Sequence, residues 1–463
     1  MKTVLKFPDG FWWGAAMSGP QSEGWAGKRY ENIMDTWYRT RREDFFDGVG
    51  PDVTSDFFHR FEEDFRRMKE AGIRSFRTSV QWTRLIADFE TGKPDVQGVA
   101  FYRSMIEAAK KNGIELVLNL HHFDMPTILF ERYGGWESRH VVELFAKFAK
   151  TAFECFGNDV RFWTTFNEPM VIVDGGYLYG YHYPGLKGKG RAGVQVLYHL
   201  CLASAMAVEQ YRKLGLKGKI GLIVNVTPAY PKSNGEADQN AARFFDWFHW
   251  RSFLDVSILG RFPEELVDVL RRDGVLWNAK EEDEALLLAN RIDFAGINYY
   301  HPTRVQAPDS IMETGWLPDR YYAHYDWPQK RINASKNWEI FPRALYDVAM
   351  AMKTLYPDTP WFVSECGMGV HDEARFRDPE GVIDDAYRIA FFEEHLEWLH
   401  RAIQEGADCF GFHVWAALDC WSWNNAYRNR YGLIEVDLND QKRTMKRSGT
   451  WYRKVSMRNG LEK

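Results

Sequence analysis

Short apolar segments alternate with amphipathic helical patterns along this 463-residue chain. The segments are largely apolar and mostly four to eight residues long, which is typical of strands buried on both faces of a parallel sheet. They cover residues 11–15, 74–80, 114–120, 162–166, 220–226, 292–299, 361–364 and 410–415. Helical patterns between them cover 61–71, 99–112, 141–156, 193–214, 341–355 and 386–404. Eight such strands with intervening helices predict an α/β fold, a (β/α)8 TIM barrel.

A doubly wound open sheet is the competing architecture. Its dinucleotide-binding form needs a Gly-x-Gly-x-x-Gly turn after an early strand, and none follows one here. Polar residues at the carboxyl ends of the predicted strands favour the barrel, because barrel enzymes keep their chemistry at that end. We expect one domain over 1–463 with long βα loops, since no low-complexity linker interrupts the chain. The strand-end residues are Arg77, His122, Asn167, Glu168, Asn298, Tyr300, Glu365 and Trp415.

Composition argues against several classes of protein. The 59 basic and 64 acidic residues leave a net charge of −5, which speaks against general nucleic-acid binding. Five cysteines without Cys-x-x-Cys spacing and scattered histidines predict neither a disulfide framework nor a metal site, and no cofactor is expected. No polar-free run approaches the roughly 18 to 20 residues of a membrane span, and the first residues do not resemble a signal peptide. A cytoplasmic protein without membrane contact is predicted, and the oligomeric state is left open.

Two glutamates end predicted strands. Glu168 lies in Thr-Phe-Asn-Glu-Pro after the fourth strand, and Glu365 lies in Val-Ser-Glu-Cys-Gly after the seventh. One such glutamate would ordinarily form a salt bridge, but two carboxyl groups at one barrel mouth can share a substrate, one protonated and one ionised. Glycoside cleavage requires this pair. Arg77 on the second strand is the cation expected to keep one of them ionised.

Several motifs resemble glycoside hydrolase family 1 over essentially the whole chain. Residues 11–15 and 21–24 resemble its opening strand and sugar-binding glutamine, 76–84 its second-strand signature, 122–126 its third-strand motif, 165–169 its acid/base motif and 298–300 its sixth-strand motif. The resemblance implies a retaining β-glycosidase on a (β/α)8 barrel. One departure is Cys366 after the seventh-strand glutamate, where the family usually has Asn. This departure concerns a local hydrogen bond and not the carboxylate chemistry.

The resemblance also implies roles for individual residues. Glu168 would be the acid/base and Glu365 the nucleophile, with Asn298 and Tyr300 supporting the nucleophile. Trp415 would form an aromatic floor under the sugar ring. Sugar hydroxyl groups would be bound by Gln21, His122 and Asn167, and Trp338 and Trp423 are candidate sugar platforms.

The segment after the eighth strand indicates a phosphorylated substrate. Ser422 stands where plain β-glucosidases of the family have a glutamate that binds the sugar O4 and O6. A carboxylate there would repel a 6-phosphate of about −1.5 to −2 charges, whereas a hydroxyl can donate to it. The loop also resembles the phosphate loop of 6-phospho-β-glycosidases, with a Ser…Lys…Tyr set. Ser422 and Tyr431 match this set, and Asn429 takes the lysine position. The neighbouring Arg428 or Arg430 could supply the missing charge, and Arg428 is preferred because the Arg430 position is basic in family members without phosphate specificity too.

A cytoplasmic, retaining 6-phospho-β-glycosidase is therefore expected, with a phosphorylated glycoside as its small-molecule partner. A 6-phospho-β-glucosidase is preferred, and 6-phospho-β-galactosidase activity stays open, as does the aglycone. One alternative is an ordinary β-glucosidase or β-galactosidase, in which Ser422 is only a small residue between Trp421 and Trp423. A more remote alternative is a carbohydrate-binding barrel without activity.

Overall fold

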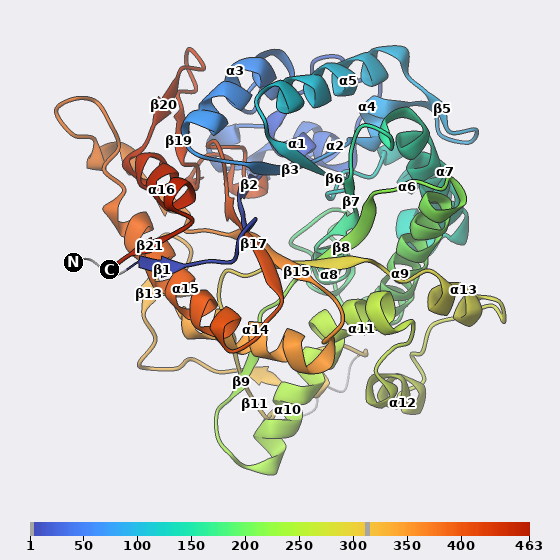
Figure 1. The fold of residues 1–463 in the computed structure, drawn as a ribbon. Helices are drawn as coiled ribbons and strands as arrows, with labels where there is room; N and C mark the ends of the chain where they lie inside the picture. Colours follow the sequence, from blue (N-terminus) through green and yellow to red (C-terminus); the bar gives the residue numbers. More distant parts are fainter. Residues whose placement is uncertain (1–3, 311–314) are drawn as a thin grey trace.

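The computed structural model describes residues 4–310 and 315–463, and within them eight parallel strands close into a barrel. Figure 1 shows these strands at the centre of the molecule with long helices around them. Each strand agrees with its predicted segment to within two residues at either end, so the TIM-barrel prediction is confirmed. In barrel order the strands are β2 (Trp12–Ala16), β3 (Ser75–Ser79), β6 (Glu115–His121), β7 (Phe162–Asn167), β8 (Lys219–Asn225), β10 (Phe294–Asn298), β15 (Trp361–Cys366) and β17 (Cys409–Trp415).

The predicted helices are all present. A capping aspartate explains one start: the Asp95 carboxylate accepts hydrogen bonds from the backbone N–H groups of Gln97 and Gly98. The predicted helices are α3 (Phe57–Glu70), α5 (Val96–Lys111), α7 (Arg139–Phe156), α9 (Gly190–Lys213), α14 (Arg343–Leu355) and α15 (Ala386–Gln404). The further α-helices are α1 (Gly19–Ser22), α2 (Ile33–Thr40), α4 (Trp82–Leu85), α6 (Thr127–Tyr133), α8 (Pro169–Val173), α10 (Glu236–Asp246), α11 (Ser252–Leu259), α12 (Glu264–Arg272), α13 (Asp283–Ala289) and α16 (Arg447–Arg458).

An aromatic cluster closes the amino-terminal end of the barrel. Trp12 contacts Phe162 and Phe410 with ring centroids 4.6 and 5.1 Å apart. Phe362 joins them through Phe410 at 5.4 Å and through Phe294 at 6.1 Å. Because each of these residues lies at or next to the start of a barrel strand, the barrel is plugged there and can admit a substrate only at its carboxyl end.

The helix α9 is long and apolar enough to cross a membrane by length and composition. Most of it is buried inside the protein, where it packs against α7, α8 and α13. Such burial is the property of a core helix. The chain ends lie together, because β1 (Val4–Lys6) pairs antiparallel with β21 (Gly460–Glu462) (Figure 1).

Three loop segments meet beside the barrel mouth. The hairpin of β13 (Ile332–Asn333) and β14 (Trp338–Glu339) is bound to the loop after β15 by two hydrogen bonds. The Asn333 side chain donates to the Gly369 carbonyl at 2.9 Å, and the His371 N–H donates to the Ser335 hydroxyl at 3.0 Å. In turn His371 pairs with Asn429 between β16 and β18. The short strands are β13 (Ile332–Asn333), β14 (Trp338–Glu339), β16 (Val370–His371), β18 (Asn429–Arg430), β19 (Ile434–Val436), β20 (Arg443–Met445), β4 (Ile86–Asp88), β5 (Lys93–Pro94), β9 (Ala229–Pro231), β11 (Thr303–Gln306) and β12 (Ala323–His324).

Candidate active site

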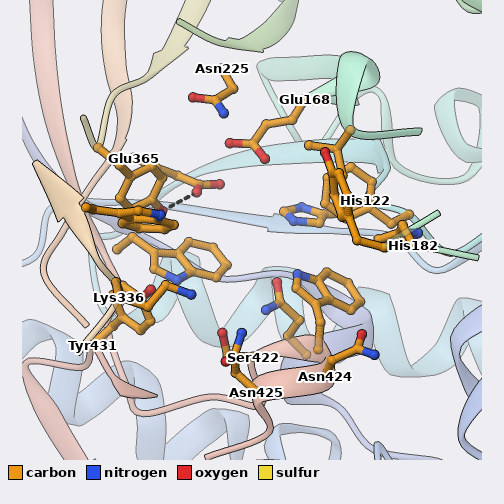
Figure 2. A pocket seen from close by; sticks show the side chains of 18 of the residues that line it. His122, Glu168, His182, Asn225, Lys336, Glu365, Ser422, Asn424, Asn425 and Tyr431 are labelled. Carbon is orange, nitrogen blue, oxygen red and sulfur yellow. Dashed lines mark hydrogen bonds between the residues drawn. The ribbon is translucent and has the colours of Figure 1, made fainter. Parts of the chain in front are cut away.

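A pocket of about 650 Å³ opens at the carboxyl end of the barrel. Figure 2 shows Glu168 and Glu365 directed into it. Most of the residues proposed from the sequence line this pocket, although they come from distant parts of the chain. They are Gln21, His122, Glu168, Tyr300, Trp338, Glu365, Trp415, Ser422, Trp423 and Tyr431.

Glu365 lies near the end of β15, and donors occupy both of its carboxylate oxygens. The Arg77 guanidinium forms an ion pair with Oε1, and the Tyr300 hydroxyl donates to Oε2 at 2.6 Å. The pKa of Tyr300 is raised well above its ordinary value by burial and then by the charge of Glu365, so the phenol stays a donor. Arg77 and Tyr300 thus both contact Glu365, which agrees with the roles expected for them, and their support of a nucleophile stays a prediction.

Glu168 follows β7 in the left-handed region at φ 47°, and Pro169 begins the short helix α8 directly after it. A left-handed glutamate is uncommon and is tolerated only where the surroundings enforce it. Desolvation by the surrounding protein raises the pKa of Glu168 to about 8, and the charge of Glu365 adds to this effect. At neutral pH Glu168 is therefore protonated, whereas Glu365 forms an ion pair with Arg77.

Asn298 lies at the end of β10, and its role differs from the predicted one. Its amide donates to Glu168 Oε1 at 2.8 Å and to Asn167 Oδ1 at 3.1 Å. Asn298 faces Glu365 only through backbone pairing between β10 and β15. The predicted contact of the Asn298 side chain with Glu365 is wrong, because its amide donates to Glu168 and Asn167 instead.

A buried set of polar side chains lies below the pocket. His122 Nε2 contacts the Asn167 amide at 3.2 Å, and His122 Nδ1 lies 3.3 Å from Arg77 Nη1. Burial, followed by the charge of Arg77, lowers the pKa of His122 well below its ordinary value, so this imidazole is neutral. Gln21 donates to the Trp421 carbonyl at 2.8 Å, which fixes it beside Ser422. These groups can form neutral hydrogen bonds with a sugar.

Aromatic rings cover the sides of the pocket. The rings of Trp415 and Trp423 both stack with the His122 ring, with centroids 6.1 and 6.0 Å from it. Trp338 contacts the Tyr300 ring at 5.4 Å. All three tryptophans proposed as sugar platforms therefore line the pocket.

The loop from Ser422 to Tyr431 corrects two predictions. Ser422 and Tyr431 line the pocket, whereas Arg428 and Asn429 are not among the described residues that line it. Arg428 is exposed, packs 5.5 Å from the Phe46 ring and lines a different surface pocket. Asn429 is buried and paired in β18. Residues 423–428 form a short 3-10 helix, a turn and a bend, and only Asn429 and Arg430 are extended, so Arg428 lies on a bend at the surface, against Phe46.

Sequence reasoning missed Lys336, which lies on the turn between β13 and β14. Among the described residues that line the pocket it is the sole lysine or arginine. Its one sequence signal was its place two residues before Trp338. Further lining residues without an assigned role are His182, Asn225, Asn424 and Asn425 (Figure 2).

Comparison with known proteins agrees with this geometry. The sequence model described as glycosyl hydrolase family 1 matches residues 3–461. The chain is 45% identical to 6-phospho-beta-glucosidase GmuD of Bacillus subtilis over 98% of both chains, and 32% identical to a 6-phospho-beta-galactosidase of Clostridium acetobutylicum over 97% of both. A family 1 β-glucosidase structure from Thermotoga maritima superposes with a TM-score of 0.91 at 31% identity, covering 100% of each chain. The chain is therefore a glycoside hydrolase and belongs to glycosyl hydrolase family 1.

Proposed function

We propose that this protein hydrolyses 6-phospho-β-glycosides with retention of configuration, and that 6-phospho-β-glucosides are preferred to the galactosides. One observation carries the proposal: the pocket that contains Glu168 and Glu365 also presents the neutral donors Ser422 and Tyr431. The higher identity to the phosphoglucosidase GmuD, 45% against 32% for the phosphogalactosidase, supports the glucoside preference.

In the first step Glu168 acts as acid and Glu365 as nucleophile. Glu168 carries a proton at neutral pH, because its pKa is raised to about 8, and gives this proton to the glycosidic oxygen. Glu365, ionised and oriented by Arg77 and Tyr300, attacks the anomeric carbon. A covalent glycosyl–enzyme ester results, and the aglycone leaves.

In the second step Glu168 acts as base. Esterification removes the charge of Glu365, which is one cause of the raised pKa of Glu168. The pKa of Glu168 therefore falls after the first step, as its new role requires. Glu168 then deprotonates the water that releases the sugar. Two carboxyl groups suffice for this chemistry, so the mechanism calls for no cofactor.

The remaining lining residues bind the substrate in this proposal. Gln21, His122 and Asn167 bind sugar hydroxyl groups, and Trp415 lies under the ring. Trp338 and Trp423 provide flanking aromatic surfaces. Ser422 and Tyr431 donate to the 6-phosphate, since burial raises the pKa of Tyr431 and keeps its hydroxyl protonated.

We also propose that the protein works in the cytoplasm. All five cysteines, each among the described residues, carry free thiols. Free thiols in this number suit a reducing compartment. Phosphorylated sugars are charged and are retained inside cells, so enzyme and substrate would share that compartment.

The test is a panel of four nitrophenyl β-glycosides: glucoside, galactoside and their 6-phosphates. We expect kcat/KM to be highest for 6-phosphoglucoside, with the β-anomer of the phosphosugar as the first product in proton NMR. Equal kcat/KM for glucoside and 6-phosphoglucoside would contradict the phosphate preference. An α-anomer as first product would contradict retention.

A further inference from the structure

Lys336 is the sole lysine or arginine among the described residues that line the pocket, and its other ionisable lining groups include the carboxyl groups of Asp44, Glu168 and Glu365. No carboxylate of the described residues forms an ion pair with Lys336, whereas Arg430 is paired with Asp419, and Lys446 is paired with Glu373 and Asp419. A partly buried ammonium without a counter-ion is the feature expected of a site that receives an anion from the substrate.

The ammonium group of Lys336 is directed along the pocket wall. Its Nζ lies 4.6 Å from the centre of the Trp338 ring, a cation–π contact that restrains an otherwise flexible side chain. Trp338 contacts Tyr300, and Tyr300 donates to Glu365. The amine is therefore linked through two rings to the carboxylate that attacks the sugar.

The same amine lies near the loop that carries Ser422 and Tyr431. Burial lowers the pKa of Lys336 to about 8, and the charge of Arg428 on this loop adds to that effect. In the view of Figure 2, Lys336, Tyr431 and Ser422 lie at one end of the pocket and Glu168 lies at the other.

Two hydrogen bonds and one strand pairing explain how the hairpin of β13 and β14, distant in the sequence, comes to lie at this end of the pocket. The hairpin of β13 and β14 is bound to the loop 369–371 through Asn333 and Ser335, and His371 of that loop pairs with Asn429. The hairpin that carries Lys336 and the 422–431 loop are thus both attached to the segment 369–371, which brings Lys336 to the same pocket as Ser422 and Tyr431.

The two arginines of the loop are engaged elsewhere. Arg428 packs on Phe46 outside the pocket. Arg430 donates to the Val436 carbonyl at 3.1 Å and lies 3.6 Å from the Asp419 carboxylate. Neither is free to neutralise an anion inside the pocket.

We propose that Lys336 is the residue that binds the phosphate charge of the substrate, completing a site of Ser422 and Tyr431 with a cation from a separate loop. The inference rests on the proposed function, because it names the group that gives the enzyme its preference for phosphorylated glycosides. Lys336 does not touch the reacting atoms in this proposal, and it determines specificity only.

The experiment measures kcat/KM for nitrophenyl 6-phosphoglucoside and nitrophenyl glucoside in wild type, Lys336→Met, Lys336→Arg and Arg428→Met. Loss of a charge-assisted hydrogen bond predicts that the ratio of the two values falls about 10- to 150-fold in Lys336→Met, mainly through KM. Lys336→Arg should recover part of the ratio. Arg428→Met is the matched control, because it removes a cation that lies outside the pocket, and it should keep the wild-type ratio of the two kcat/KM values.

Inhibition by glucose 6-phosphate and by glucose provides a second measurement. In Lys336→Met the inhibition constant of glucose 6-phosphate should rise, and that of glucose should change far less. Because both ligands bind one preparation, a folding defect that lowers the active fraction cannot change this difference.

Two results would overturn the inference. An unchanged substrate ratio in Lys336→Met would show that the amine does not bind phosphate. An equal loss for both substrates would assign Lys336 to the sugar or aglycone. A wild-type enzyme without preference for the phosphorylated substrate would instead contradict the proposed function itself, so the two failures can be told apart.

Discussion

The active-site pocket has two walls of different construction. Glu168 and Glu365 extend from β7 and β15, strands that are hydrogen-bonded to neighbours on both sides in a closed sheet. Ser422, Tyr431 and Lys336 extend from loops joined to one another by a few hydrogen bonds and short pairings. The comparison teaches that the residues that break the bond are held by barrel strands, whereas the residues proposed to select the substrate charge are held by loops.

The two walls also control charge differently. On the barrel wall, desolvation keeps Glu168 protonated and Arg77 is paired with Glu365. On the loop wall, neutral hydroxyl groups and one unpaired amine face the pocket. Variants on the first wall should therefore affect every substrate, and variants on the second should affect phosphorylated substrates selectively.

The largest effect is expected from Glu365→Gly. Loss of the nucleophile should lower kcat for all substrates at least about 10⁴-fold, since no other group can form the glycosyl ester. Added azide should restore turnover and give the α-glycosyl azide, detectable by NMR. Retention of substantial activity without azide would place the nucleophile elsewhere.

Glu168→Gln should lower kcat about 10²- to 10⁴-fold for substrates with poor leaving groups, and much less for dinitrophenyl glycosides, which need no proton. In the wild type, kcat/KM should fall as pH rises through about 8, because the acid form of Glu168 is then lost. This alkaline limb should be absent in the variant. Equal losses for good and poor leaving groups would argue against an acid role.

Ser422→Glu tests the loop wall. A carboxylate beside the 6-phosphate adds a like-charge repulsion and removes one donor, so kcat/KM for the phosphorylated substrate should fall about 10- to 150-fold. Its ratio to the value for the plain glucoside should fall by at least as much. Ser422→Ala, which removes the donor without adding charge, is the matched control. An equal loss for both substrates would make Ser422 a packing residue.

The smallest effect is expected from Asn298→Ala. The Asn298 amide donates to Glu168 and favours its ionised form, so removal should raise the pKa of Glu168 further. The alkaline limb of the pH–rate profile should move to higher pH by less than about one unit. A shift of the acidic limb alone would return Asn298 to the role of supporting Glu365.

The two walls also differ in how well the sequence predicted their residues. Glu168 and Glu365 end apolar strand segments, and parallel strands must bring their carboxyl ends to one edge, so their meeting followed from periodicity and the barrel rule. Asn298 was placed at the barrel mouth and assigned to Glu365, whereas its amide contacts Glu168. Strand position brings a side chain into the mouth, and it does not decide which of two neighbouring carboxyl groups the amide contacts.

Arg428 and Lys336 show the limit more clearly. Arg428 was chosen because it adjoins Ser422 and Tyr431 in the sequence, yet the turn and bend at 426–428 place it outward on Phe46. Lys336 lies far from both residues in the sequence, and the contacts of the β13–β14 hairpin with the 369–371 loop bring it into the same pocket. No local pattern encodes such a contact.

The sequence by itself determined the barrel, the two carboxylates and the family motifs, because strand burial and strand-end chemistry are repeated, short-range properties of the chain. The tertiary structure alone decided that Glu168 is desolvated beside Glu365, that Asn298 bonds to Glu168 and that Lys336 enters the pocket in place of Arg428. These features depend on how loops pack against one another. Packing of that kind is set by long-range contacts, which residue order and periodicity do not contain.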